Sequence, residues 1–166
     1  MALIKDNALA SDPFVHVTEG ERPPAAGAVL VHLEDWQASR NELLARGDEL
    51  GVWLKSDQSP ELIERDLGRL ALVALEFPAF RDGRAYSYAR ILRERYGFDG
   101  EIRAVGDVLM EQLHFMMRTG FDAFEIQGDD ALAQFRAAMQ DFSVWYQPTG
   151  DGRLTATQLR HRAGAG

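Results

Sequence analysis

The sequence predicts an α/β fold built on a mainly parallel sheet of five or six strands. From about residue 28 onward, short apolar runs alternate with amphipathic stretches, which is typical of repeated strand-helix units. Several of these runs are almost entirely apolar, as expected for strands covered on both faces. They recur about every 20 to 28 residues, an ordinary spacing for βα units. The pattern fits an open doubly wound sheet or an incomplete barrel.

A complete eight-fold barrel is excluded by length, because it needs about 200 residues or more and the chain has 166. Five strands are predicted from the apolar runs, and the segment SVWYQP is the candidate for a sixth. The five are residues 28–33 (AVLVHL), 51–55 (GVWLK), 70–77 (LALVALEF), 101–105 (EIRAV) and 121–126 (FDAFEI), and SVWYQP covers 143–148.

Capping residues mark where the helices begin and end. In SPELIERDL, Ser59 is the predicted N-cap and Pro60 the first helical residue. Asp107 is predicted to cap a helix in GDVLMEQLHFMMRTG, and Gly120 to end it. Further helices are predicted in YSYARILRERYG, which stops at Gly97, and in DDALAQFRAAMQDF.

Three segments are predicted along the chain. Residues 1–27 form a small N-terminal hairpin, from ALIKD and FVHV, followed by the proline-containing linker ERPPAAGA. Residues 28–147 form the α/β domain. Residues 148–166 form a flexible tail, because they offer little apolar surface to bury.

Charge and composition exclude several classes of function. The net charge of −8 removes the long-range attraction that non-specific DNA or RNA binding requires, so no nucleic-acid partner is expected. No run of about 18 uncharged apolar residues is present, and charged residues interrupt the N-terminus where a signal peptide would be apolar. We therefore expect a cytoplasmic protein with no membrane partner. The chain contains no cysteine, which excludes disulfides, a thiol nucleophile and an iron-sulfur cluster held by its own thiolates.

Ligands of parallel sheets collect beyond the carboxyl ends of the strands, because the connecting loops converge there. The stretch FPAFRDGRAYSYARILRERYG, residues 77–97, lies at such an end and combines arginines, a turn glycine and hydroxyl groups. An arginine-rich turn on an anionic protein attracts a small oxyanion such as sulfite, phosphate or a carboxylate. We predict an anion site formed by Arg81, Arg84, Ser87 and Arg90. The alternative is that these arginines only pair with nearby carboxylates or solvent.

The same rule places further polar residues at this edge of the sheet. Three candidates for catalytic groups follow from it: Asp82 and Asp107 as acid or base, and Tyr86 as a side chain facing the site. The other polar residues at or just beyond the carboxyl ends of predicted strands include His32, Glu34, Asp35, Lys55, Ser56, Asp57 and Glu76.

No cofactor or metal can be named from sequence motifs. The glycines of YGFDGEIRAVGDV lack the G-x-G-x-x-G spacing after a strand, so no dinucleotide fingerprint is present. Any cofactor is therefore unknown. The four histidines, His16, His32, His114 and His161, are dispersed along the chain, and no metal site is predicted from them.

The run FPAFRDGRAYSYARILRERYGFDGEIRAVGDVLMEQLHFMMRTGFDAFEI resembles the hallmark of a bacterial family labelled domain of unknown function 934. LIKD, LGVWLKSD, LALVALEFP and FSVWYQP also fit, so the resemblance covers nearly the whole chain. Its motif falls on Phe77, Pro78, Phe80, Asp82, Gly83, Arg84, Tyr86, Ser87, Arg90, Gly106, Asp107, Gln112, Gly120, Phe121 and Asp122.

Members of this family are typically encoded beside the haem-containing assimilatory sulfite reductase and are often labelled probable oxidoreductases. The resemblance implies a cytoplasmic accessory protein of sulfite reduction within sulfate assimilation, with sulfite reductase as the suspected partner. It assigns no catalytic residues. From the residues alone, two other functions stay open: a small α/β enzyme acting on an anionic metabolite, with the arginines as an anion clamp, and a structural or regulatory homodimer.

Overall fold

A computed structural model describes residues 1–79, 81–128 and 130–140 of the chain. Its eight strands form one sheet in the order β2-β1-β8-β7-β6-β5-β4-β3. The strands are β1 (Ala2–Lys5), β2 (Ala8–Ala10), β3 (Val15–His16), β4 (Val29–His32), β5 (Leu50–Leu54), β6 (Leu72–Phe77), β7 (Glu101–Gly106) and β8 (Ala123–Ile126).

The predicted α/β class and mainly parallel sheet are confirmed. Strands β3 to β8 run parallel in sequence order, and only the pairs β1–β2 and β1–β8 are antiparallel. The helices are α1 (Leu33–Leu44), η1 (Pro60–Arg69), α2 (Arg84–Arg90), η2 (Ile91–Arg95), η3 (Met110–Gln112), α3 (Leu113–Thr119) and α4 (Ala131–Gln140).

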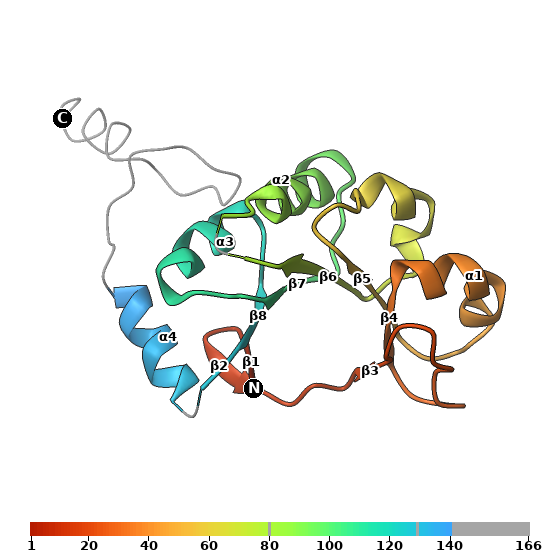
Figure 1. Cartoon of the computed structure of the whole chain (residues 1–166), viewed down its shortest axis with the longest axis horizontal. Helices are drawn as coiled ribbons and strands as arrows, with labels where there is room; N and C mark the ends of the chain where they lie inside the picture. The colour runs from red at the N-terminus through yellow and green to blue at the C-terminus, as the bar shows by residue number, and fades with distance from the viewer. Residues whose placement is uncertain (80, 129, 141–166) are drawn as a thin grey trace, which may run out of the picture.

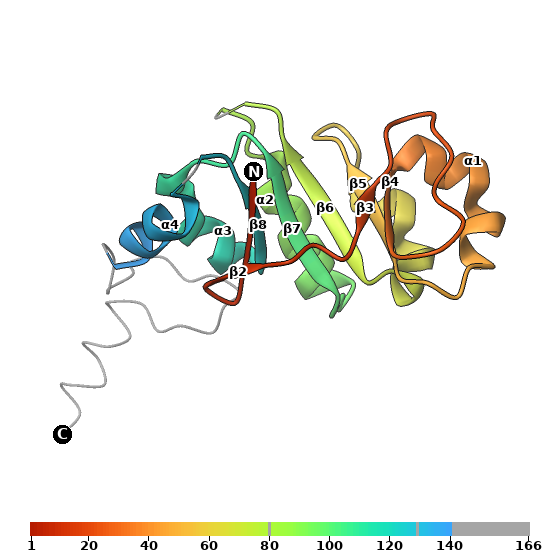
Figure 2. The ribbon, with the colours of Figure 1, turned by 90° about the horizontal axis from the view of Figure 1, so that it is seen from below.

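The sheet curls into a half-barrel, so of the two predicted architectures the incomplete barrel is the one that forms. Because each parallel strand is the neighbour of the one before it, right-handed crossovers place every connecting helix on the same face. Figures 1 and 2 show α1, α2 and α3 on this convex face. A doubly wound sheet would reverse its strand order and carry helices on both faces, and that alternative was wrong.

The number of strands exceeds the prediction of five or six because the N-terminal segment adds three. ALIKD does form a hairpin, but its partner is β2, reached through a tight turn at Asp6 and Asn7, which have φ of 52° and 61°. FVHV instead supplies β3, which pairs in parallel with β4 at the other edge of the sheet. The pairing of ALIKD with FVHV was therefore wrong, because both segments find longer partners in the main sheet.

The main core lies between the convex face and its helices. It buries alternate residues of the strands, such as Val31, Val52 and Val73, against helix residues that include Trp36 and Leu92. A second, smaller cluster lies on the concave face and contains Leu30, Leu72, Ala74 and Val105, with Phe14 and Trp53 packed against it. Both faces of the central strands are therefore covered, as their apolar sequences predicted.

Helix boundaries agree with the capping signals in part. Ser59 is the N-cap of η1, and its Oγ accepts from the backbone N–H of Glu61, although this element is a 3-10 helix. Gly120 ends α3 with φ of 117°, as predicted. Asp107 does not cap a helix, because η3 begins at Met110 and α3 at Leu113.

The five predicted strands between residues 28 and 126 are confirmed as β4 to β8, each within two residues at either end. The candidate sixth strand, 143–148, and the predicted tail, 148–166, lie outside the described residues. No helix in the described part of the chain is long and apolar enough to cross a membrane.

Candidate functional site

The predicted arginine turn lies at the carboxyl end of β6, where α2 begins. Arg84 donates from Nε to Asp82 Oδ1 at 3.0 Å and from Nη2 to Asp82 Oδ2 at 2.5 Å. The same Nη2 donates to Ser56 Oγ at 2.9 Å, and Ser56 follows β5. Arg84 therefore ties together the two loops that follow neighbouring strands.

Asp82 is held in the ionised form by this contact. Its hydrogen bonds from the Arg84 guanidinium and from the Arg84 backbone N–H lower the pKa of the Asp82 carboxyl well below its ordinary value. A carboxylate with such a low pKa is a weak base at neutral pH. The geometry makes Asp82 the counter-ion of Arg84 in the free protein.

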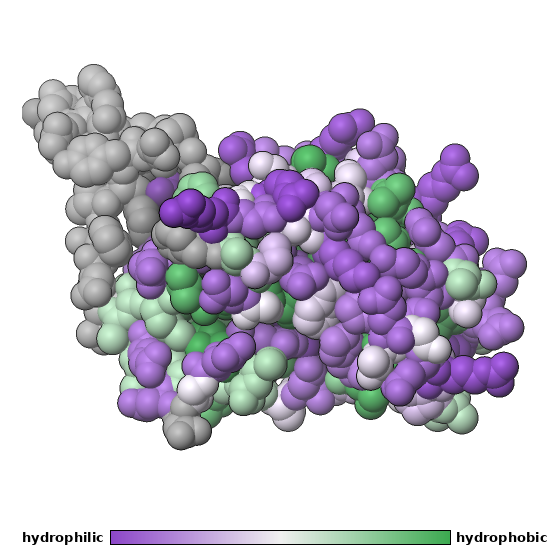
Figure 3. Space-filling model, in the orientation of Figure 1, coloured by the Kyte–Doolittle hydropathy of each residue, from purple (hydrophilic) through white to green (hydrophobic). Residues whose placement is uncertain are grey.

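The other residues of the predicted anion site are exposed and spread along α2. Arg90 pairs with Glu94 at 3.3 Å one turn later, an ordinary surface spacing. Arg81 and Ser87 are exposed, and no hydrogen bond of either side chain occurs within the described residues. Four cavities of about 180 to 610 Å³ are lined by other parts of the chain. On the face of the molecule shown in Figure 3, the surface over α1 and α2 is mostly hydrophilic.

Tyr86 and Asp107 differ in burial: Tyr86 is half-buried, whereas Asp107 is exposed. The Tyr86 ring packs edge-on against Phe77 and Phe115, with centroids 5.1 and 4.8 Å apart. Burial raises the pKa of Tyr86 to about 12, so its hydroxyl keeps its proton at neutral pH. Asp107 is exposed in the loop after β7, and its backbone N–H donates to Phe77 O at 2.7 Å.

The ends of β6 and β7 approach so closely that one residue must be glycine. Gly106 has φ of 88°, and a Cβ there would lie 2.5 Å from the carbonyl oxygen of Phe77. No real Cβ contact is that short, and L-residues rarely adopt this φ. Gly106 therefore fixes the position of the Asp107 loop beside the arginine turn.

A second group of polar side chains lies on the concave face, near the carboxyl ends of β3 to β6. We call this group the concave cluster, and it consists of His16, His32, Trp53 and Glu76. His32 and Trp53 are register partners on neighbouring strands, so their side chains share a face. The cluster occupies the edge of the half-barrel at which ligands of parallel sheets collect.

The members of the concave cluster contact one another in a chain. The His16 ring stacks on Trp53 at 4.6 Å with an interplanar angle of 6°, and its Nε2 lies 3.1 Å from Nε2 of His32. Trp53 Nε1 donates to Glu76 Oε2 at 3.3 Å. Each ring of the cluster is thus fixed by at least one neighbour.

The surroundings of His16 favour the neutral form of its imidazole. Burial, the nearby His32 and the Arg103 guanidinium together lower the pKa of His16, against a smaller opposing effect of Asp12. The Nδ1 atom of His32 is buried and has no partner in the described structure. In the neutral pair, a proton on His32 Nε2 directed at His16 avoids burying an unpaired N–H group.

Arg103 is the centre of a buried ion network on the same concave face. Its side chain is 0% exposed and donates to Asp12 at 2.6 Å, Glu101 at 2.7 Å and Glu125 at 3.1 Å. Burial opposes its charge, but the hydrogen bonds that Arg103 donates to Asp12 and Glu101 raise the pKa of Arg103 overall. Arg103 therefore remains charged while buried.

The chain between β2 and β3 crosses the concave face to reach this network. Asp12 bonds Arg103, and the Phe14 ring lies 5.9 Å from the Arg103 guanidinium carbon. Figure 2 shows this segment running in front of β7 and β6. It connects the two edges of the sheet and brings His16 to the concave cluster.

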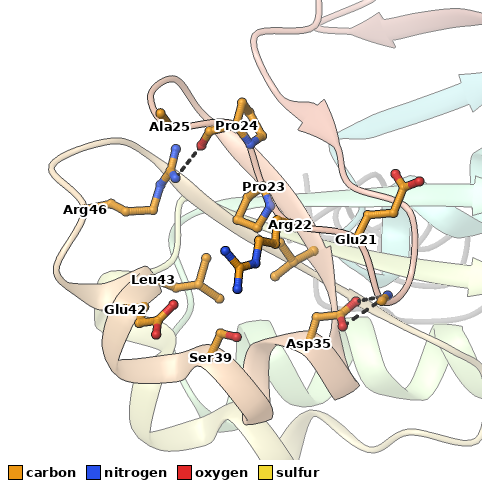
Figure 4. A pocket seen from close by; sticks show the side chains of 12 residues that line it. Glu21, Arg22, Pro23, Pro24, Ala25, Asp35, Ser39, Glu42, Leu43 and Arg46 are labelled. Atoms are coloured by element: carbon orange, nitrogen blue, oxygen red, sulfur yellow. Dashed lines mark hydrogen bonds between the residues drawn. The ribbon is translucent and has the colours of Figure 1, made fainter.

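A cavity of about 480 Å³ lies between the loop after β3 and α1 (Figure 4), at the same edge of the sheet as the concave cluster. Asp35 accepts from the backbone N–H of Gly20, and Arg46 donates to the carbonyls of Pro24 and Gly27. Arg22 points into the hollow. Both Asp35 and Arg46 are thus engaged in anchoring the loop that forms the wall.

Sequence reasoning placed His32 and Glu76 at the correct edge of the sheet, but it treated the histidines as dispersed and missed the concave cluster. His16 and His32 are 16 positions apart, and only the parallel pairing of β3 with β4 brings them together. The alternation of FVHV and VLVH carried a weak signal, because both histidines occupy strand positions with apolar neighbours. Arg103 was counted among the cations near the arginine turn but was not predicted as a site residue, because it stands in the middle of a predicted strand.

Residues 51–160 match the model of one protein family, described as "Bacterial protein of unknown function (DUF934)". The match covers more than half of the chain, so the chain belongs to this family, which confirms the resemblance of its motifs. No curated protein matches the chain. The matched region includes the arginine turn, Trp53, Glu76 and Arg103, whereas His16 and His32 precede it.

Proposed function

We propose that this member of the DUF934 family is a cytoplasmic accessory protein of assimilatory sulfite reduction, which docks on sulfite reductase and assists electron delivery to it. The proposal rests on the kinship of the chain and on one structural observation. Three guanidinium groups, those of Arg81, Arg84 and Arg90, project from a single turn and helix of a protein whose net charge is −8.

Exposed arginines suit a docking surface better than a closed anion site in this arrangement. Arg84 and Arg90 are 53% and 51% exposed, and each has one carboxylate partner, Asp82 or Glu94. Surface ion pairs of this kind exchange partners at little cost. An acidic patch on a partner, or a small oxyanion held between the two proteins, can therefore engage the same guanidinium groups.

The test is a mixing experiment with purified sulfite reductase and a reduced electron donor. Sulfite turnover and complex formation are measured with wild-type protein and with the double variant Arg81→Gln, Arg90→Gln, which leaves the Arg84–Asp82 pair in place. We expect the wild type to bind the reductase and change its turnover, and the double variant to bind more weakly. The difference should shrink at high salt, because the Debye length falls to about 3 Å at 1 M.

Arg136→Gln is the matched control, because this exposed arginine lies on α4, away from α2 (Figure 1). It removes one positive charge without touching the arginine turn, so binding should stay at the wild-type level. If the double variant and Arg136→Gln lose the same binding affinity, the net charge of the protein, and not the arginine turn, controls binding. Failure of the wild type to bind the reductase or change its turnover would refute the proposal.

The concave cluster favours a second candidate function, a small α/β enzyme acting on an anionic metabolite. Imidazoles and a carboxylate gathered at the carboxyl edge of a half-barrel occupy the position of catalytic groups in barrel enzymes. This candidate predicts that His32→Gln abolishes any activity found on anionic metabolites and leaves reductase binding unchanged. The docking proposal predicts instead that reductase binding depends on the arginine turn and not on His32.

A further inference from the structure

Two histidines of the concave cluster meet at a distance that suits a metal ion. Nε2 of His16 and Nε2 of His32 lie 3.1 Å apart. Two nitrogens that each lie about 2.1 Å from one metal ion, at the angles of tetrahedral or octahedral geometry, are separated by about 3.0 to 3.4 Å. The pair therefore already has the spacing of a chelating site.

We propose that His16 and His32 bind a divalent transition-metal ion through their Nε2 atoms, at the carboxyl ends of β3 and β4. Imidazole is the ligand preferred by Zn²⁺, Cu²⁺ and Ni²⁺ among divalent ions, whereas Mg²⁺ and Ca²⁺ prefer oxygen. The proposal does not rest on the function proposed above. It assigns a binding site that lies on the concave face, opposite the helices.

The surroundings hold the two rings in place and leave a path for the ion. Trp53 stacks flat on His16 and lies 5.3 Å from the His32 ring, so neither imidazole can rotate freely. Glu76 in turn fixes Trp53. His16 is exposed and His32 is half-buried, which gives a metal ion access from solvent.

The site supplies two ligands and leaves the other coordination positions open. No group of three or more His, Cys, Asp or Glu side chains is arranged to hold a metal ion within the part of the chain that is described. Water or an external anion therefore completes the coordination. Open positions are the feature that separates exchangeable and catalytic zinc sites from closed structural ones.

The competing explanation is a direct hydrogen bond between two neutral imidazoles, which gives the same distance. In that arrangement His32 Nε2 keeps a proton directed at His16 Nε2. Metal binding has to move this proton to Nδ1 of His32, which is buried and has no partner within the described residues, so the exchange lowers the affinity of the site. The two explanations differ in their response to added metal, and this difference is the basis of the test.

Zn²⁺ binding to the full chain is measured by calorimetry after treatment with a chelator. We expect one saturable site per chain, and an affinity lowered by at least about tenfold in His16→Gln and in His32→Gln, since loss of an outer partner alone costs about 10- to 100-fold. Asp99→Asn, which alters an exposed carboxylate in the turn between η2 and β7, is the control and should bind like the wild type. Circular dichroism establishes that each variant is folded.

Nitrogen NMR of the wild-type chain labelled in its imidazoles keeps the test decisive if a variant fails to fold. Zn²⁺ should shift the Nε2 signals of His16 and His32 together and leave His114 unchanged. Absence of saturable Zn²⁺ binding overturns the proposal. So does an affinity that is equal in the wild type and in both folded variants, or an NMR response confined to other histidines.

Discussion

Arg84, in the arginine turn, and Arg103, in β7, occupy opposite environments. Arg84 is 53% exposed and pairs with one neighbouring carboxylate, Asp82. Arg103 is 0% exposed and lies among three carboxylates: Glu101 from its own strand, and Asp12 and Glu125 from more distant parts of the chain. The first is free to exchange partners, while the second holds the N-terminal crossing segment on the concave face.

Arginines that lie within about 20 residues of one another in the sequence therefore need not form one patch. β7 points Arg103 to the concave face, whereas α2 points Arg84 and Arg90 to solvent on the other side of the sheet. Arg93, on η2, is engaged differently again, because it donates to three backbone carbonyls and to Asp122. Each arginine must therefore be judged by its own neighbours.

The largest effect should come from Arg103. Replacing it by Ala leaves Asp12, Glu101 and Glu125 without their shared cation, and breaking a buried ion pair in this way costs about 3 to 5 kcal/mol. Urea unfolding of the wild type and of Arg103→Ala measures the loss. Arg95→Ala is the control, because its guanidinium is exposed and its contact within the described part of the chain is with the Tyr96 ring, at 5.4 Å. Similar losses in the two variants would show that Arg103 has no special place in the fold.

A smaller loss is expected from Gly106→Ala. The added Cβ would lie 2.5 Å from Phe77 O, and the residue would keep φ of 88°, a strain of about 1 to 3 kcal/mol. The variant should lower the melting temperature and disturb the loop beside the arginine turn. Gly47→Ala is the matched control, since its Cβ meets no atom within 4 Å, and it should melt like the wild type.

Arg84→Gln should affect binding more than stability. Its ion pair with Asp82 is exposed to solvent, so the unfolding free energy should change less than in Gly106→Ala. Affinity for the reductase should fall, in the mixing experiment described above. A variant that unfolds as readily as Arg103→Ala would reverse the comparison and make Arg84 the structural residue of the two.

The smallest effect concerns pH. Because the pKa of His16 is lower in the folded chain than its ordinary 6.5, the unfolded chain binds this proton more readily. The contribution of neutral His16 to stability is therefore present above about pH 6.5 and is lost as the pH falls below it. His32 and Arg103 cause part of this shift, and Asp12 opposes it.

The measurement is the unfolding free energy in chelator at pH 7.5 and at pH 5.5. The wild type should lose more stability between these two values than His16→Gln, which has no imidazole to protonate. Identical pH dependence in the two proteins would show that the concave cluster does not resist protonation.

Much of the fold could be predicted from the sequence, because strands and helix ends are marked by residues that lie close together in the chain. Short apolar runs located five strands, and the capping residues Ser59 and Gly120 located two helix ends. The predicted start of this helix at Asp107 was wrong. Aspartate is a common N-cap residue, but Asp107 lies in the tight loop that begins at Gly106. Local signals also identified the arginine turn, although they could not tell which guanidinium groups would be exposed.

By itself, the sequence determined the α/β class, the family and the edge of the sheet where polar groups collect, because each follows from residues close together in the chain. Only the tertiary structure decided that the sheet is singly wound and that His16 meets His32. It also decided that Arg103 is buried among carboxylates from residues 12, 101 and 125. The physical reason is strand register, which sets the face and the neighbours of every side chain and depends on pairing between distant segments.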